Sequence, residues 1–194
     1  MKTGAVILAG GKSRRMGGTC KADLIIGDRS IFERIRQELD FFDEIIISSN
    51  DTEKYEKYGR VMTDIYKNCG PAGGIYTALE NCEADALFVT ACDMPFIRSE
   101  TIKGLFGLLG DCDGTAVKNG ERIEPLFAVY RKSTAAHFGN CIESGIYSMN
   151  RILDGLNMNY VSAAEIGVEA HEFTNINTPE DYERITEAEY ENKP

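Results

Sequence analysis

The sequence predicts an α/β fold in which helices cover both faces of a mostly parallel sheet, giving three layers, with one antiparallel hairpin inserted. Short apolar runs alternate along the chain with amphipathic stretches of helical period, the pattern of strands connected by helices. One run, residues 86–91, is continuously apolar, as expected for a strand buried on both faces. The chain has 194 residues, enough for one such fold, so we expect a single domain over residues 1–194.

The first half of the chain is predicted to alternate strands with helices. The predicted strands are residues 5–8, 44–48, 60–63 and 86–91. Ser30 and Glu33 have the spacing of a capping box, which begins a helix running to about Leu39. A short helix is expected around residues 53–57, and Pro71 suits the first turn of a longer one.

The second half contains the antiparallel element. Ser99 is predicted to cap a helix that Gly110 ends. The turn dipeptide Asn119-Gly120 joins residues 115–118 to residues 124–130 and predicts a hairpin. Beyond it, the pattern predicts helices near 134–142 and 149–156, a strand near 160–161, and a last helix starting at Thr178 and Pro179.

Composition excludes several classes of function. Hydrophobic residues make up 43% and charged residues 27%, which is ordinary globular usage and argues against a disordered chain. The formal net charge of −10 would repel a phosphate backbone, so nucleic acid and anionic membranes are not expected partners. No apolar run is long enough for a signal peptide or a membrane span, so a cytoplasmic location is expected. The six cysteines form no C-x-x-C pair, and no zinc spacing emerges.

A glycine-rich, basic loop follows the first predicted strand. It runs as Leu8-Ala9-Gly10-Gly11-Lys12-Ser13-Arg14-Arg15-Met16-Gly17-Gly18 and is followed by Lys21. Glycines let backbone N–H groups approach phosphate oxygens and basic side chains supply the opposite charge, so we interpret the loop as a phosphate cradle. The P-loop spacing is absent because Val6 stands where its first glycine belongs, and the dinucleotide-binding spacing is absent too. A solvated loop without a ligand is the alternative.

Polar side chains follow several predicted strands, at the edge where open α/β sheets bind ligands. Asp93 comes just after the continuously apolar strand and is predicted to hold Mg²⁺, with a turn cap as the alternative. Asn50 follows the second strand and is a candidate contact for a base or ribose, and Asp64 ends the third strand. Asn175 and Asn177 precede the last helix and are candidates for contacting an acceptor or completing the metal shell, against a role in capping.

Several ordered blocks together resemble one family. They are Leu8 to Gly11, Arg15-Met16-Gly17 with Lys21, Gly70-Pro71-Ala72-Gly73-Gly74, Ala91-Cys92-Asp93-Met94-Pro95, Glu124-Pro125-Leu126, and Asn175-Ile176-Asn177-Thr178-Pro179-Glu180-Asp181. The chain resembles the molybdenum cofactor guanylyltransferases of MobA type, within the glycosyltransferase-A-like nucleotidyltransferases. The resemblance implies a Rossmann-like, nucleotide-diphospho-sugar transferase-like sheet.

The resemblance also implies roles for individual residues. The implied contacts to GTP are Leu8, Ala9, Gly10, Gly11, Lys21, Asn50, Asp64 and Asp93. Asp93 would bind Mg²⁺, Asn175 and Asn177 would face the pterin, and Lys21, Asp93 and Arg15 would be catalytic by neutralising phosphate charge. The family usually has Asp immediately before the loop lysine, where this chain has Cys20, so a possible orienting partner of Lys21 is missing.

The reaction implied by the resemblance transfers GMP from GTP to the terminal phosphate of molybdopterin, releasing pyrophosphate and forming the guanine dinucleotide cofactor. GTP and molybdopterin are then the expected partners, together with proteins that deliver the product to molybdoenzymes. Two alternatives stay open. One is a related nucleotidyltransferase that uses CTP or a sugar-phosphate acceptor, and the other is a non-catalytic protein that binds nucleotide or cofactor.

Overall fold

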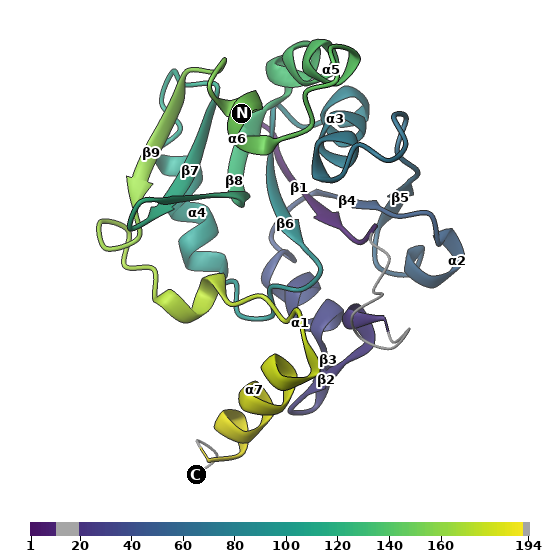
Figure 1. Ribbon diagram of the computed structural model, residues 1–194, viewed down its shortest axis with the longest axis vertical. Helices are drawn as coiled ribbons and strands as arrows, with labels where there is room; N and C mark the ends of the chain where they lie inside the picture. Colours follow the sequence, from purple (N-terminus) through teal and green to yellow (C-terminus); the bar gives the residue numbers. More distant parts are fainter. Residues whose placement is uncertain (11–19, 192–194) are drawn as a thin grey trace.

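A seven-stranded sheet organises the molecule (Figure 1). The computed structural model describes residues 1–10 and 20–191 of the chain. The strands of this sheet are β1 (Thr3–Leu8), β4 (Glu44–Ser48), β5 (Arg60–Met62), β6 (Ala86–Ala91), β7 (Gly114–Asn119), β8 (Arg122–Arg131) and β9 (Met158–Ser162). Their order across the sheet is β5-β4-β1-β6-β8-β7-β9. The first four elements of that order are parallel, whereas β8 runs antiparallel to both of its neighbours, β6 and β7.

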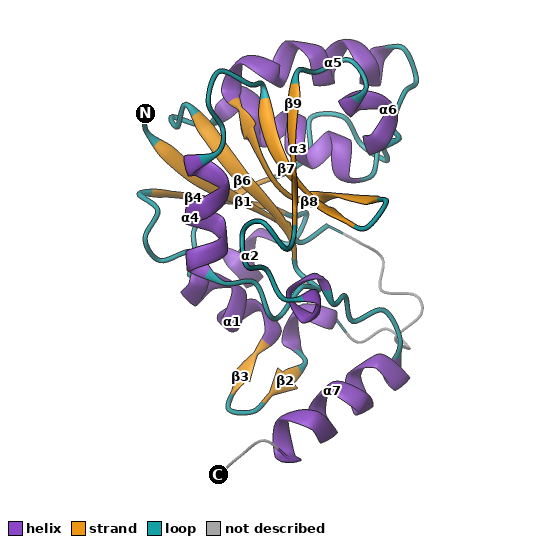
Figure 2. Cartoon of the chain, turned by 90° about the vertical axis from the view of Figure 1, so that its left-hand side faces the viewer, coloured by secondary structure: helices purple, strands orange, loops and turns teal. Residues whose placement is uncertain are grey.

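Helices cover both faces of the sheet, as Figure 2 shows from the side. On one face lie α3 (Pro71–Asn81), α5 (Ala135–Glu143) and α6 (Met149–Leu153), and on the other lie α1 (Ile31–Glu38) and α4 (Ser99–Gly107). Each face has its own hydrophobic cluster. The cluster beneath α1 and α4 includes Phe88 and Phe127, whereas the cluster beneath α3 and α5 includes Tyr130 and Phe138. The sheet is therefore buried on both sides, as a parallel sheet requires.

Short elements surround the carboxyl ends of the parallel strands. They are the 3₁₀ segments η2 (Lys21–Asp23) and η4 (Ala170–Phe173), the hairpin β2 (Ile25–Ile26) and β3 (Arg29–Ser30), and the helices α2 (Thr52–Tyr55) and α7 (Pro179–Glu191). A third 3₁₀ segment, η3 (Lys132–Thr134), follows β8 at the opposite, amino edge, where the Lys132 backbone N–H donates to the Asp85 carbonyl. Helix α7 extends from the body of the molecule beside the β2–β3 hairpin (Figure 1). The Tyr182 hydroxyl fixes it there by donating a 2.6 Å hydrogen bond to the Ile25 carbonyl.

Helix α3 packs unusually close to the sheet because its first turn is built from glycine. A Cβ at Gly74 would lie 2.6 Å from Ser48 Oγ and 2.9 Å from Leu8 Cδ2, so any side chain there would push the helix away from β1 and β4. Gly70 caps the helix with φ of 60°, a conformation that L side chains rarely adopt. Pro71 follows at the first helical position, as expected from the sequence.

Most of the predicted elements are confirmed, and the differences have local causes. The strands at 44–48 and 86–91 have the predicted bounds, and Ser30 forms the predicted capping box with Glu33. The prediction that Ser99 caps α4 is wrong. Ser99 is the first residue of the helix, and its backbone N–H donates instead to Glu38 Oε2 at 2.8 Å, which joins α4 to α1. The β2–β3 hairpin was not predicted, since two-residue strands carry no readable alternation.

Candidate active site at the carboxyl edge of the sheet

Three side chains from distant parts of the chain meet just beyond the end of β6. The Lys21 ammonium lies 3.1 Å from Asp93 Oδ2 and donates a 2.8 Å hydrogen bond to Asn177 Oδ1. The Lys21 and Asp93 side chains are 17% and 21% exposed, so the ion pair is mostly shielded from water while still accessible to a ligand. The structure thereby brings together one residue of the predicted phosphate site, the predicted metal ligand and one predicted acceptor contact.

Backbone contacts hold these three residues in place. Lys21 begins η2, whose middle residue Ala22 is buried in the core. Asp93 lies in the turn that ends β6, and its carbonyl accepts a 3.0 Å hydrogen bond from the Ile176 backbone N–H. Asp181, in the first turn of α7, accepts hydrogen bonds from the Asn177 and Thr178 backbone N–H groups. The segment that carries Asn177 is therefore fixed at both of its ends.

The residues assigned to the nucleotide follow β1, β4 and β5, on one side of Asp93. Leu8 and Ala9 end β1, and the Ala9 N–H donates to the Ser48 carbonyl at 2.9 Å. Gly10 is exposed just beyond them. Asp64 follows β5 and accepts a 2.7 Å hydrogen bond from the Ser48 hydroxyl. These contacts join the ends of three adjacent strands into one surface beside the ion pair.

Ser48 is a residue of this surface that the sequence interpretation missed. It is 3% exposed, it orients Asp64, and it is the group that a side chain at position 74 would displace. A serine at the end of an apolar strand indicates a polar group at the edge of the sheet where ligands bind. It was overlooked because serine is also an ordinary strand-end residue.

Other predicted residues have no direct partner at the site. Asn50 is exposed after β4, where the next residue, Asp51, caps α2. Asn175 is half-buried, and its side chain makes no hydrogen bond to another residue in the described part of the chain. Gly11 and Arg15 lie outside the described residues. Their assignments remain predictions from the sequence.

Cys20 lies against α2 rather than beside the ion pair. Its sulfur is 3.6 Å from the Tyr55 hydroxyl. Burial lowers the pKa of Lys54, but hydrogen bonds with Asp23 and Cys20 raise it by more, so the pKa lies above its ordinary value. Burial also raises the pKa of Tyr55, which keeps the phenol neutral. Asp93 and Asn177 orient Lys21, so this chain holds the lysine in place without a carboxylate at position 20.

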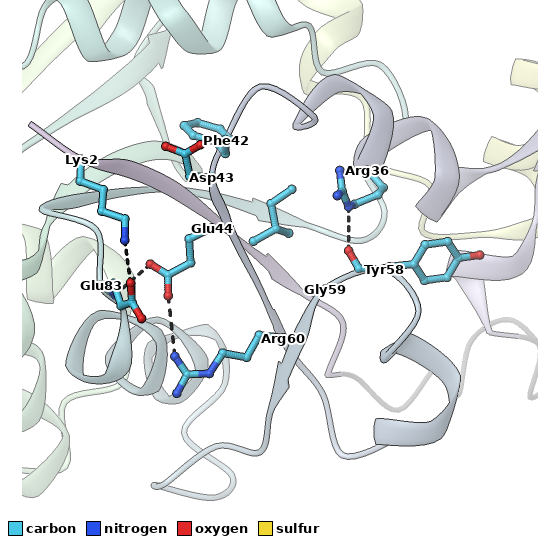
Figure 3. Close-up of a pocket in the computed structure, with 10 residues that line it drawn as sticks. Lys2, Arg36, Phe42, Asp43, Glu44, Tyr58, Gly59, Arg60 and Glu83 are labelled. Carbon is cyan, nitrogen blue, oxygen red and sulfur yellow. Dashed lines mark hydrogen bonds and ion pairs between the residues drawn. The ribbon is translucent and has the colours of Figure 1, made fainter.

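A cavity of about 380 Å³ lies at the opposite, amino edge of the sheet (Figure 3). Four of its charged side chains, Lys2, Glu44, Arg60 and Glu83, contact one another. Lys2 contacts Glu83 at 2.6 Å, and Glu44 accepts the backbone N–H of Glu83 while facing Arg60 at 3.7 Å. Arg36 donates to the Tyr58 carbonyl. Satisfied polar groups of this kind tie the amino ends of β1, β4 and β5 together, and none of the predicted site residues lies there.

The donor set at the carboxyl edge fits a hard divalent cation that is shared with a substrate. Within residues 1–10 and 20–191, no cluster of three or more His, Cys, Asp and Glu side chains could hold a metal. Asp93 Oδ1 accepts no hydrogen bond from a described residue, and it is a carboxylate oxygen of the type Mg²⁺ prefers. One carboxylate with phosphate oxygens completing the shell is a common arrangement for this ion.

Comparisons with known proteins identify the family of this chain. The profile of the MobA-like NTP transferase domain matches residues 5–159. The chain belongs to this family. A relative from Clostridium perfringens strain SM101, named "Probable molybdenum cofactor guanylyltransferase", is 43% identical over 134 residues, covering 69% of this chain and 68% of the relative. The molybdenum cofactor guanylyltransferase of Syntrophotalea carbinolica is 35% identical over 191 residues, covering 95% of this chain and 91% of the relative.

A solved structure extends the match of this MobA-like NTP transferase to nearly its whole length. The crystal structure of molybdopterin-guanine dinucleotide biosynthesis protein A from Archaeoglobus fulgidus matches with a TM-score of 0.82 at 28% identity, covering 98% of this chain and 100% of that chain. The predicted fold class, family and nucleotidyltransferase activity are thereby confirmed. No helix in the described part of the chain is long and apolar enough to cross a membrane.

Proposed function

We propose that this MobA-like NTP transferase joins GMP from GTP to the terminal phosphate of molybdopterin, releasing pyrophosphate. The observation that carries the proposal is the meeting of Lys21, Asp93 and Asn177 beyond β6, directly beside the end of β1 where the glycine-rich loop begins. A triphosphate bound beside the end of β1 would have its phosphates next to Lys21 and Asp93. The relatives named molybdenum cofactor guanylyltransferase support guanine and the pterin as the two substrates.

The chemistry demands charge neutralisation more than proton transfer. A phosphate monoester has a second pKa near ~6, so the acceptor is already largely a dianion at neutral pH and needs no protein base. Lys21 binds the phosphate oxygens and offsets their negative charge, and the Asn177 amide holds its ammonium on the acceptor side. Mg²⁺, bound by Asp93 and the triphosphate, would supply further neutralisation and help to align the α-phosphate. Arg15 is proposed to add positive charge from the loop.

Two competing functions predict different measurements. A relative of the same fold that uses CTP would bind cytidine nucleotides at least as well as GTP. A protein that only stores or delivers the cofactor would bind GTP and molybdopterin without releasing pyrophosphate. The mostly shielded ion pair at the edge favours an enzyme, since a binding module has no need to hold an ammonium against a carboxylate beside the reacting phosphates.

Thermal unfolding in the presence of nucleotides provides the first test. We expect GTP with Mg²⁺ to raise the melting temperature more than CTP, ATP or UTP, because a ligand that binds only the folded state stabilises it by linkage. The second measurement is pyrophosphate release on adding molybdopterin and GTP. A shift with CTP as large as that with GTP contradicts the guanine assignment, and GTP binding without pyrophosphate release contradicts catalysis.

Replacing Lys21 separates binding from stability. We expect Lys21→Ala to weaken GTP binding roughly tenfold or more, because the variant loses a charge-assisted contact to phosphate. The melting temperature of the ligand-free protein should change less, since the Lys21 side chain contacts two polar groups at the surface of the sheet edge, whereas the buried residue of η2 is Ala22. Calorimetric titration and thermal unfolding measure the two effects. Lost stability with unchanged GTP affinity would make Lys21 a structural residue.

A further inference from the structure

Glu124 occupies the same edge of the sheet as Asp93. Strand β8 runs antiparallel to β6, and Phe127 lies opposite Thr90, the next-to-last residue of β6. Glu124 precedes Phe127 by three residues, so it lies past the end of β6, where β8 continues as the β7–β8 hairpin (Figure 2). Asp93 follows the end of β6 as well. The two carboxylates are therefore carried by adjacent strands at one edge.

Glu124 also points to the face that carries the catalytic residues. It pairs with Val117, and residues opposite one another in an antiparallel ladder share a face. Val117 belongs to the hydrophobic cluster that contains Ala22 and Ile176, the direct neighbours of Lys21 and Asn177. The Phe127 and Phe173 rings, 5.1 Å apart, join β8 to the segment that leads to Asn175. Glu124 thus faces the layer that supplies the acceptor side of the site.

The Glu124 carboxylate is buried yet poorly satisfied. The residue is 8% exposed, and its single interaction with a described residue is an ion pair at 3.2 Å from Oε1 to Nε of Arg122, whose own side chain is 73% exposed. Burial raises the pKa of Glu124, and Arg122 offsets this only in part. In the described part of the chain, Thr115 Oγ1 is the one fully enclosed side-chain nitrogen or oxygen atom that lacks a hydrogen bond. The second Glu124 oxygen also lacks a hydrogen bond, so it is not fully enclosed and still reaches the surface.

The cost of burying the Glu124 carboxylate indicates that it has a function. A carboxylate that is 8% exposed and has a single ion-pair partner is costly to keep charged, and a strand position between apolar neighbours would be more stable with an apolar side chain. Arg122 is too exposed to compensate for the burial. A ligand that brings N–H donors to the free oxygen supplies the missing partners.

The order of strands decides which substrate reaches Glu124. The residues assigned to GTP follow β5, β4 and β1, Asp93 follows β6, and β8 lies on the far side of β6. The nucleotide and the acceptor must meet at the phosphates beside Asp93. The acceptor therefore extends away from the nucleotide, over the first residues of β8, which lie at this edge because β8 is antiparallel to β6. A pterin presents a ring N–H and a 2-amino group side by side, which match the two oxygens of a carboxylate.

Resting on the proposed function, we propose that Glu124 recognises the pterin of the acceptor by accepting hydrogen bonds from its 2-amino-4-oxo edge. It is a specificity-determining residue of the acceptor site. It takes no part in the transfer of the nucleotidyl group, so its loss affects acceptor affinity far more than turnover at saturation. Arg122 positions the carboxylate by holding Oε1.

The test compares two pterin-type ligands that differ at the 2-position. 6-Hydroxymethylpterin phosphate and the matching lumazine, which has an oxo group in place of the 2-amino group, are titrated by fluorescence with Mg²⁺ and an α,β-methylene analogue of GTP present. We expect wild type to prefer the pterin, and Glu124→Gln to weaken pterin binding roughly ten- to hundredfold while changing lumazine binding much less. Glu121→Gln is the matched control, since Glu121 is 98% exposed in the same hairpin and undergoes the same change of charge.

Each outcome bears on the assignment. Unchanged preference for pterin in Glu124→Gln overturns it. Glu124→Asp keeps the charge, so it should still prefer the pterin over the lumazine while binding the pterin more weakly. If Glu124→Asp loses this preference while Glu124→Gln retains it, the assignment of Glu124 to the pterin is also wrong. If Glu124→Gln instead changes the preference for GTP over ITP, which lacks the 2-amino group, Glu124 reads the guanine and the acceptor assignment is wrong. Wild type that releases no pyrophosphate from GTP and molybdopterin contradicts the proposed function itself, separately from the role of Glu124.

Discussion

Asp93→Asn is expected to fold normally and to lose nearly all pyrophosphate release, by roughly 10²- to 10³-fold in turnover. The amide has the same shape as the carboxylate, and Asp93 makes its backbone contact to Ile176 through the carbonyl, which the substitution leaves in place. The variant loses a hard anionic ligand for Mg²⁺ and the charged partner that orients Lys21. Steady-state release of pyrophosphate at saturating GTP and molybdopterin measures the effect.

Two comparisons make this result specific. Asp111→Asn makes the same chemical change at an exposed position outside the proposed site, and it should retain full activity. Lys21 gains freedom in Asp93→Asn. The variant should therefore bind GTP less tightly than the wild type does when Mg²⁺ is present, and the two affinities should differ less when Mg²⁺ is omitted. Near-normal turnover in Asp93→Asn would reduce Asp93 to a turn residue.

Gly73→Ala and Gly104→Ala are expected to change stability in opposite directions. A Cβ at Gly73 would lie 2.6 Å from the Tyr66 carbonyl oxygen, a backbone atom that cannot rotate away, so the substitution should cost about 1–3 kcal/mol. A Cβ at Gly104, within α4, would meet no atom within 4 Å. Alanine there should gain about 0.5–1 kcal/mol from helix propensity alone.

Urea unfolding of the two variants measures this difference directly. Both substitutions add one methyl group to a helical glycine, so their contrast isolates the close approach of α3 to the strand-end loop. A shift of α3 that relieves the contact with Tyr66 should also weaken GTP binding, because the next residue, Gly74, lies against Ser48, which donates to Asp64. If Gly73→Ala were as stable as Gly104→Ala, the tight packing of α3 would be relaxed in solution and would not position Asp64.

The arrangement of strands and helices was predictable because it depends on local patterns. Patterns of only a few residues predict three of these elements: the apolar run of β6, the capping box at Ser30 and the Asn119-Gly120 turn. The order of the strands is less local. That β8 enters the sheet between β6 and β7 follows from long-range pairing, which single-sequence patterns do not specify.

The site was predictable as a set of residues, but its contacts were not. The positions of Lys21, Asp93 and Asn177 at strand or helix ends indicated polar roles, yet nothing in their spacing indicates that one ammonium contacts both of the other side chains. The burial of Glu124 was equally hidden. Glu124 begins the predicted strand 124–130, a pattern that does not indicate its burial, and its pairing with Val117 is what places it on the face of the sheet that carries Ala22 and Ile176.

The contact between Lys21 and Asn177 has a consequence for the timing of activity during synthesis and unfolding. These residues are 156 positions apart, so their contact cannot form until the chain has been synthesised beyond β9, the last strand of the sheet. Helix α7 extends away from the core (Figure 1), so the segment that carries Asn177 opens more easily than the sheet. Under mild denaturation we therefore expect the contact between Lys21 and Asn177 to break before the sheet unfolds.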